Sequence, residues 1–181
     1  PLEGNLPAHD FEESVGSVEF DELTGVAMDD DYFYVADKRA GAVYVWAGIP
    51  DGTHDPVATL VVDQPTRLSS DGTWLAVNST MGHAAQLFRV DQIATSGTYT
   101  TVGGRGVFNL PEGTTVSNGH LFVADTGNNQ VHAWEHVADA IAGRSADVIL
   151  GASGPSDKQP EISRNQMFWP AATSFDGNYL W

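Results

Sequence analysis

The chain has 181 residues, and its 24 acidic residues against 8 basic ones give a formal net charge of −16 at pH 7. So acidic a chain repels phosphate groups, which argues against nucleic acid as a partner, and no apolar run approaches the roughly 18 residues that a membrane-spanning helix needs. The absence of cysteine excludes a disulfide scaffold, a thiolate zinc site and a catalytic thiol.

Lysine is scarce, since Lys38 and Lys158 are the only two in the chain. An acid-rich, lysine-poor surface suits an extracytoplasmic or secreted setting, although solubility alone would also explain it. The sequence begins with Pro1 and shows no basic-then-apolar leader, so we expect a processed or trimmed product.

Taken in chain order, the sequence predicts a connecting segment followed by repeated β units. Residues 1–19 lack a strand pattern of their own and form the connecting segment. Three similar units then cover about residues 20–62, 63–104 and 107–152, and residues 166–181 begin a fourth unit that is incomplete. Each complete unit has the composition of about four short strands, rich in Val, Tyr, Phe, Trp and Thr and broken by glycine turns.

The three units share one pattern, which is GVAMDDDYFYVADKRAGAVYVW, then RLSSDGTWLAVNSTMGHAAQLF, then GTTVSNGHLFVADTGNNQVHAW. An apolar strand ends in a short polar anchor residue, which is Asp37, Asn78 or Asp125. Four residues later comes a residue that tolerates positive φ, which is Gly41, Gly82 or Asn129, and a tight hairpin is expected there. A second strand then closes on Trp46, Phe88 or Trp134. The anchors recur roughly every 41–47 residues, the period of a four-stranded propeller blade.

Further strands are expected at the outer edges, over residues 57–62, 99–102 and 147–150. One stretch has helical spacing, HVADAIA at residues 136–142, and is expected to form a helical turn on a connecting loop.

The segment LFVADTGNNQVHAW resembles an NHL repeat, and YVADKRAGAVYVW resembles one too. The later stretch from Ala146 to Trp181 is similar to the longer-looped NHL repeats of bacterial propellers. The second unit departs from the pattern, with Asn78 in place of aspartate and one extra residue before Phe88. The resemblance covers residues 20–181 and implies an all-β fold, a β-propeller that in this family commonly has six blades. About three and a half of them are present here.

The repeated anchors are the first candidate site. Asp37, Asn78 and Asp125 hold one position in three blades, so they would form a ring about the propeller axis. Calcium favours such oxygen ligands at about 2.3–2.6 Å. Alternatively, each anchor only accepts hydrogen bonds from the amides of its own turn. Both interpretations stay open at this point, and no resident cofactor is expected.

Other candidate residues give weaker signals. His132 and His136 would lie about 13 Å apart on a strand, too far for one zinc ion, so no metal site is expected from the histidines. Most tryptophans recur at equivalent blade positions and should pack between blades. Trp169 lies in an inserted loop before Pro170 and is therefore the expected exposed aromatic contact.

No catalytic constellation is visible, so the sequence predicts a non-catalytic NHL-type propeller module that binds a small ligand or a protein. The alternative is a metal-dependent propeller enzyme of the gluconolactonase or lyase kind, with a divalent cation in the axial channel. Because three and a half blades do not close a ring, we expect a homodimer or a fragment of a larger propeller. Neither nucleic acid binding nor membrane insertion is expected.

Overall fold

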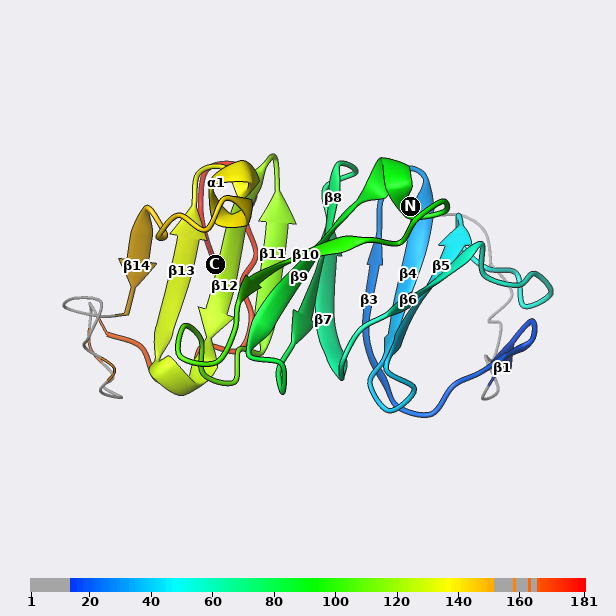
Figure 1. Cartoon of the computed structure of the whole chain (residues 1–181), viewed down its shortest axis with the longest axis horizontal. Helices are drawn as coiled ribbons and strands as arrows, with labels where there is room; N and C mark the ends of the chain where they lie inside the picture. The colour runs from blue at the N-terminus through cyan, green and yellow to red at the C-terminus, as the bar shows by residue number, and fades with distance from the viewer. Residues whose placement is uncertain (1–13, 152–157, 159–162, 164–165) are drawn as a thin grey trace, which may run out of the picture.

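The computed structural model describes residues 14–151, 158, 163 and 166–181. The predicted propeller architecture is confirmed, because these residues form three four-stranded antiparallel sheets and one two-stranded hairpin. Figure 1 shows the sheets standing next to one another as blades, with the short helix α1 (Val137–Ile141) at one end of the last. This helix lies within the stretch that was predicted to be helical.

The three blades follow one another along the chain. Blade 1 consists of β3 (Leu23–Met28), β4 (Tyr32–Asp37), β5 (Ala42–Ala47) and β6 (Ala58–Val61). Blade 2 consists of β7 (Pro65–Ser70), β8 (Trp74–Ser79), β9 (Ala84–Arg89) and β10 (Tyr99–Gly103). Blade 3 consists of β11 (Gly113–Ser117), β12 (His120–Asp125), β13 (Gln130–Trp134) and β14 (Val148–Leu150). The predicted outer strands are thus present as β6, β10 and β14.

The core lies between the blades, because each central strand is covered on both faces. The side chains of Tyr34, Leu75 and Leu121 on β4, β8 and β12 are fully buried. Phe88 lies in the cluster between blades 1 and 2, and Trp134 lies in the cluster between blades 2 and 3. Their packing confirms that the recurring aromatic residues fill the space between blades.

The hairpin turns follow the prediction in two blades and depart from it in one. Gly41 and Asn129 have φ of +66° and +59°, as expected. In blade 2, however, the residue with positive φ is His83, at +55°, so the prediction for Gly82 is wrong. The last pair of that hairpin is Ser79 with Ala84, and its turn has four residues, as in the other two blades. Ser79 rather than Asn78 is therefore the counterpart of Asp37 and Asp125, and the extra residue that the alignment placed before Phe88 does not exist.

The first blade is not bare on its outer flank. A hairpin of β1 (Ser14–Val15) and β2 (Val18–Glu19) packs against it, and Val15 and Val18 cover Val35 and Trp46. Residues 14–19 of the predicted connecting segment thus form a hairpin, which covers part of the outer flank of blade 1. The hairpin caps the blade as a terminal repeat does in other repeat proteins.

The last described residues begin a fourth unit beside blade 3. Phe175 and Leu180 form an antiparallel bridge, and the carboxylate of Asp176 accepts hydrogen bonds from the amides of Asn178 and Tyr179. The side chains of Tyr179 and Trp181 are 67% and 75% exposed. The homodimer therefore stays a prediction, and this flank is where we propose that it would form. Among the helices of the described residues, none is long and apolar enough to cross a membrane.

Candidate functional site: the axial groove

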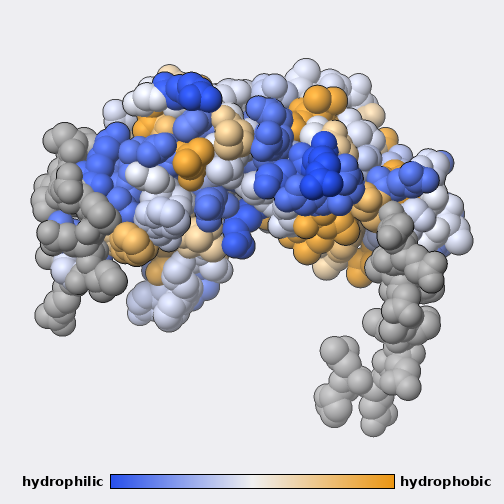
Figure 2. All heavy atoms as spheres, turned by 90° about the horizontal axis from the view of Figure 1, so that it is seen from below, coloured by the Kyte–Doolittle hydropathy of each residue, from blue (hydrophilic) through white to orange (hydrophobic). Residues whose placement is uncertain are grey.

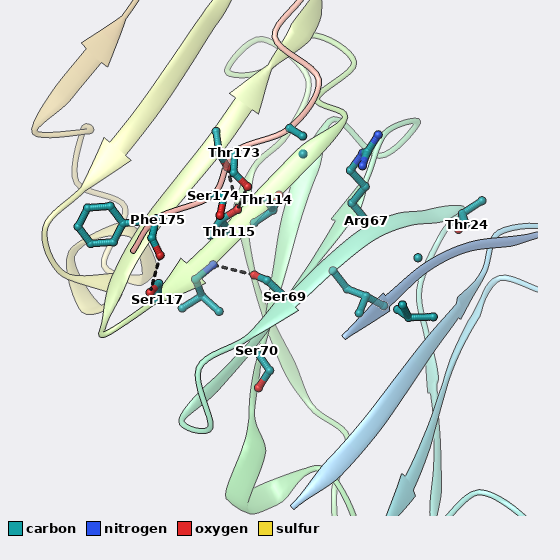
Figure 3. A pocket seen from close by; sticks show the side chains of 16 residues that line it. Thr24, Arg67, Ser69, Ser70, Thr114, Thr115, Ser117, Thr173, Ser174 and Phe175 are labelled. Atoms are coloured by element: carbon teal, nitrogen blue, oxygen red, sulfur yellow. Dashed lines mark hydrogen bonds between the residues drawn. The ribbon is translucent and has the colours of Figure 1, made fainter. Parts of the chain in front are cut away.

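A groove runs along the inner strands, where the blades meet the propeller axis. It has a volume of about 440 Å³ and is lined by β3, β7 and β11 together with residues 172–175. Figure 2 shows the hollow side of the arched molecule, and Figure 3 shows the side chains that line the groove. Its volume is within the range of small-molecule sites in proteins.

The inner strands pack closely because two of them carry glycine at the same position. A Cβ atom on Gly25 would lie 2.6 Å from the carbonyl oxygen of Thr66, and one on Gly113 would lie 2.7 Å from that of Ala171. Real Cβ atoms are essentially never found so close to another heavy atom. The glycines therefore allow one inner strand to approach the backbone of the next blade.

Arg67 holds the equivalent position in blade 2. The pairing of β7 with β8 shifts register between Pro65 and Leu68, which is a β-bulge, and such bulges redirect side chains. Arg67 is exposed and lines the groove, and Figure 3 shows its side chain extending between the two walls. No sequence motif marks this residue. The signal that would find it is the repeat position that it shares with Gly25 and Gly113.

One wall of the groove is rich in hydroxyl groups. The Thr173 hydroxyl donates to that of Thr115 at 2.8 Å, and the Ser69 hydroxyl accepts from the Val116 amide at 2.7 Å. These bonds tie neighbouring inner strands together and fix the wall. The dashed lines in Figure 3 mark hydrogen bonds of this kind between residues that line the groove.

Asp29 supports the groove from behind, since its carboxylate accepts hydrogen bonds from the hydroxyl groups of Ser70 and Tyr34. Burial alone would raise the pKa of Asp29, but these bonds and the amides of Tyr32 and Asp31 lower it below its ordinary value. Asp29 therefore remains a carboxylate at neutral pH, and its charge is already engaged.

On the opposite side, β3 contributes Thr24, Gly25 and Val26 to the lining of the groove. Val26 pairs directly with Val35, so the two side chains share one face of blade 1, where Val35 packs against the terminal hairpin. The exposed side chains of Val26 and Met28 therefore lie on the outer flank of blade 1, on the face away from blade 2.

Among the described residues, the three anchors of the predicted ring have no hydrogen-bond partner in common. Asp37 is fully buried and accepts hydrogen bonds from the amides of Asp21, Glu22 and Ala40 at 2.7–3.0 Å. Burial opposes ionisation, but these amides lower the pKa of Asp37 below its ordinary value. The carboxylate thus ties the chain that enters blade 1 to the hairpin that leaves it, and the turn-capping alternative describes these contacts.

Asp125 has the same role in blade 3. It accepts from the Asn109 amide and from the Asn128 side chain, both at 2.7 Å. His132 lies 3.3 Å from the same carboxylate and stacks on Trp134. His132 is thus a packed residue of the blade rather than one half of a pair with His136.

Asn78 lies one register position before the equivalents of Asp37 and Asp125, because Ser79 forms the last pair of its hairpin. Its side chain consequently points to the other face of the sheet. There its Nδ2 donates to the Pro111 carbonyl at 2.7 Å and its Oδ1 accepts from Thr114 at 3.1 Å. Asn78 joins blade 2 to blade 3.

Trp169 is 64% exposed, as the sequence predicted, and stacks on Phe168 with an interplanar angle of 17°. Its amide donates to the Asn129 side chain, and its φ is +51°, an unusual value for a large side chain. Trp169 is outside the groove. Among the described residues no group of three or more His, Cys, Asp or Glu is placed to hold a metal ion.

These features define a β-propeller that is open on one side. The NHL repeat family model matches residues 108–134, which contain the first three strands of blade 3. With the three four-stranded sheets, this match is consistent with a partial propeller of the NHL-repeat type. No curated protein matches the chain in sequence.

Three solved structures show the same fold at low identity. The computationally designed Ika4 protein has a TM-score of 0.60 at 12% identity, covering 93% of this chain and 89% of its own. The hydrazine synthase of Kuenenia stuttgartiensis has a TM-score of 0.63 at 13% identity, covering 94% of this chain and 44% of its own. The computationally designed Ika8 protein has a TM-score of 0.59 at 11% identity, covering 87% of this chain and 41% of its own. This chain therefore spans less than half the length of the latter two.

Proposed function

We propose that this protein is a non-catalytic binding module that holds a small ligand in the axial groove. The observation that supports the proposal is the groove itself, where the inner strands of three blades bring hydroxyl groups and an exposed arginine around one space. Small ligands usually bind in concave sites where a few polar groups converge.

The buried anchors support a binding function rather than a reaction at the ring. The oxygen atoms of Asp37 and Asp125 accept hydrogen bonds from amides of their own blade and of the chain that enters it. A cation that used these oxygens would have to displace bonds that hold the hairpins.

The proposal is tested by filling the groove. Arg67→Trp places a bulky ring at an exposed position whose side chain extends into the groove, so it should block the groove without disturbing the core. Val61→Trp is the matched control, because Val61 is 79% exposed on the outer strand β6, away from the groove. Nuclear magnetic resonance with a small-molecule fragment mixture should show amide shifts clustered at Gly25, Ser69 and Val116 in the unmodified chain.

Those shifts should persist in Val61→Trp and disappear in Arg67→Trp. Fragments that bind Arg67→Trp as well as the unmodified chain, or that shift only amides outside the inner strands, would show that the groove is not the binding site.

A further inference from the structure

A second hollow lies between blades 2 and 3, at the hairpin-turn end of the blades. It has a volume of about 320 Å³ and is lined by His83 of the blade 2 turn, by residues of the loop after β10 and by Asn128 of the blade 3 turn, together with Lys158. Among the described residues that line it are two cations, Arg105 and Lys158, and no aspartate or glutamate. The lining of this hollow thus carries only positive charge, in a chain whose net charge is −16.

The two cations of the hollow have no acidic partner, whereas most other basic side chains do. Within the described part of the chain, Arg105 and Lys158 take part in no ion pair and no side-chain hydrogen bond. Arg67 is also unpaired, but it stands alone in the axial groove. Four other basic side chains each lie within 3.1 Å of a carboxylate oxygen, namely Lys38, Arg39, Arg89 and Arg144.

The backbone that carries Arg105 is held in a tight glycine loop. Gly104 and Gly106 flank it with φ of +119° and +93°, which residues with a Cβ rarely adopt. A Cβ atom on either glycine would have no other atom within 4 Å, so these glycines serve the loop conformation and not close packing. The amides of Val107 and Phe108 both donate to the Gly104 carbonyl, at 3.0 and 3.2 Å, and close the loop.

His83 adds a hydrogen-bond donor to the hollow. Its backbone carbonyl accepts from the Gly104 amide at 2.8 Å, and its Nδ1 accepts from the Leu110 amide at 3.2 Å. Because Nδ1 is an acceptor, the proton of the neutral ring is on Nε2, which has no partner among the described residues. His83 and Leu110 both have positive φ, of +55° and +48°, and strained residues of this kind cluster at functional sites.

Blade 3 forms the floor of the hollow. Asn109 and Asn128 line it, and their backbone amide and side chain respectively donate to the carboxylate of Asp125, which is fully buried. This carboxylate is therefore engaged by the blade and pairs with neither cation. Lys158 is fixed through its backbone carbonyl, which accepts from the Asn129 side chain at 3.0 Å.

We propose that this hollow binds one phosphate group, with Arg105 and Lys158 as its cations and His83 Nε2 as a further donor. A phosphate monoester carries about −1.5 to −2 charges at pH 7, which matches two cations, and its oxygen atoms accept several hydrogen bonds at once. A carboxylate has one charge and two oxygen atoms, so it would leave one cation unbalanced. Repulsion by the acidic chain grows with the charge of the ligand, so the site takes a small phosphate and not a nucleic acid.

The phosphate group belongs either to the free ion or to a small organic ester, and two probes separate these sources. Nuclear magnetic resonance titration of the full chain with inorganic phosphate or glycerol 3-phosphate should shift the amides of Gly104, Gly106 and Asn109. Acetate at the same ionic strength should bind roughly tenfold or more weakly. Tighter binding of glycerol 3-phosphate would assign an organic phosphate, and equal or tighter binding of inorganic phosphate would assign the free ion.

Arg105→Gln and Lys158→Gln should each weaken phosphate binding roughly tenfold. Arg89→Gln is the matched control, because Arg89 is also an exposed arginine but lies at the opposite end of β9 from the turn that holds His83. It removes the same charge from the chain and should leave phosphate binding unchanged. Urea unfolding curves of Arg105→Gln and Lys158→Gln should match that of the unmodified chain, since neither side chain has a partner among the described residues.

Three results would overturn the proposal. The first is that acetate binds as tightly as phosphate, and the second is that Arg89→Gln weakens phosphate binding as much as Arg105→Gln does. The third is that neither phosphate shifts the amides of the hollow in the unmodified chain. The axial groove is judged separately, by the fragment shifts at Gly25, Ser69 and Val116, so each proposal can fail without the other.

Discussion

Blade 2 differs from blades 1 and 3 at two places, and the two differences have different meanings. At the hairpin, Ser79 replaces the buried aspartate of the other blades, in a turn of the same length. At the inner strand, Arg67 replaces a glycine. The first difference is compensated locally, because Ser79 still binds within its own blade, accepting from the Gly82 amide and donating to the Asp63 carbonyl. The second is not compensated in the fold, which is why we connect Arg67 with function.

The largest effect is expected from removing a buried anchor. Asp125→Ala would leave the Asn109 amide and the Asn128 side chain without their acceptor, so it should lower the free energy of unfolding by about 2–3 kcal/mol. Ser79→Ala in blade 2 loses neutral hydrogen bonds and should cost about 1 kcal/mol. Urea denaturation of both variants measures the difference. Equal losses of unfolding free energy would mean that Ser79 stabilises its hairpin as much as Asp125 stabilises the hairpin of blade 3.

The inner-strand comparison is tested by exchanging glycine and a side chain. Gly25→Ala places a Cβ against the Thr66 carbonyl and should cost about 1–3 kcal/mol through overpacking. Arg67→Gly should change the free energy of unfolding by less than about 1 kcal/mol, since Arg67 makes no paired contact among the described residues. A large loss for Arg67→Gly would assign this arginine to stability instead of binding.

The turns should respond more weakly. Gly41→Ala places a Cβ at φ of +66° and 3.5 Å from the Val62 carbonyl oxygen, which is an ordinary contact distance, so backbone strain alone should cost about 1 kcal/mol. His83→Gly in blade 2 relieves the same kind of strain and should be neutral or slightly stabilising. Thermal melts compare the two, and destabilisation by His83→Gly would indicate that the imidazole contacts matter more than the backbone. His83 Nδ1 accepts from the Leu110 amide, which is the contact in question.

The anchor carboxylate should also produce a pH dependence. The amides around Asp37 lower its pKa in the folded state, so its contribution to stability is present above its unfolded pKa of about 3.9 and is lost as the pH falls through the folded pKa. Asp37→Asn removes this contribution. The unfolding free energies of variant and unmodified chain should therefore converge as the pH drops below about 4, as urea titrations at several pH values would show. A difference that stays constant down to strongly acidic pH would contradict the assignment.

Calcium should have the smallest effect. The anchors already accept hydrogen bonds, so millimolar calcium should leave the melting temperature nearly unchanged. A site saturated at a hundredfold excess over its Kd would instead stabilise the chain by roughly 2.7 kcal/mol. If calcium raised the stability of the unmodified chain and of Arg67→Gln by this amount, but not that of Asp37→Asn, the ring of anchors would be a metal site after all.

The sequence by itself determined the blade architecture, because strand periodicity, turn residues and buried aromatics repeat within each unit of some 40 residues and depend on local backbone and packing rules. It predicted the helix at Val137–Ile141 and the exposure of Trp169 for the same reason. The capping of blade 1 by Val15 and Val18 depends on contacts between segments that are distant in the sequence, so no local sequence pattern predicts it.

Only the tertiary structure decided the site. The anchors looked equivalent in an alignment, but the strand pairing makes Ser79 the counterpart of Asp37 and Asp125. Asn78 therefore lies on the other face of the sheet, since side chains alternate along a strand. Arg67, an ordinary arginine in the sequence, becomes distinctive because strands from three blades and the segment beyond them converge around it. Convergence of distant segments is set by how blades pack about an axis, and a linear pattern does not contain that geometry.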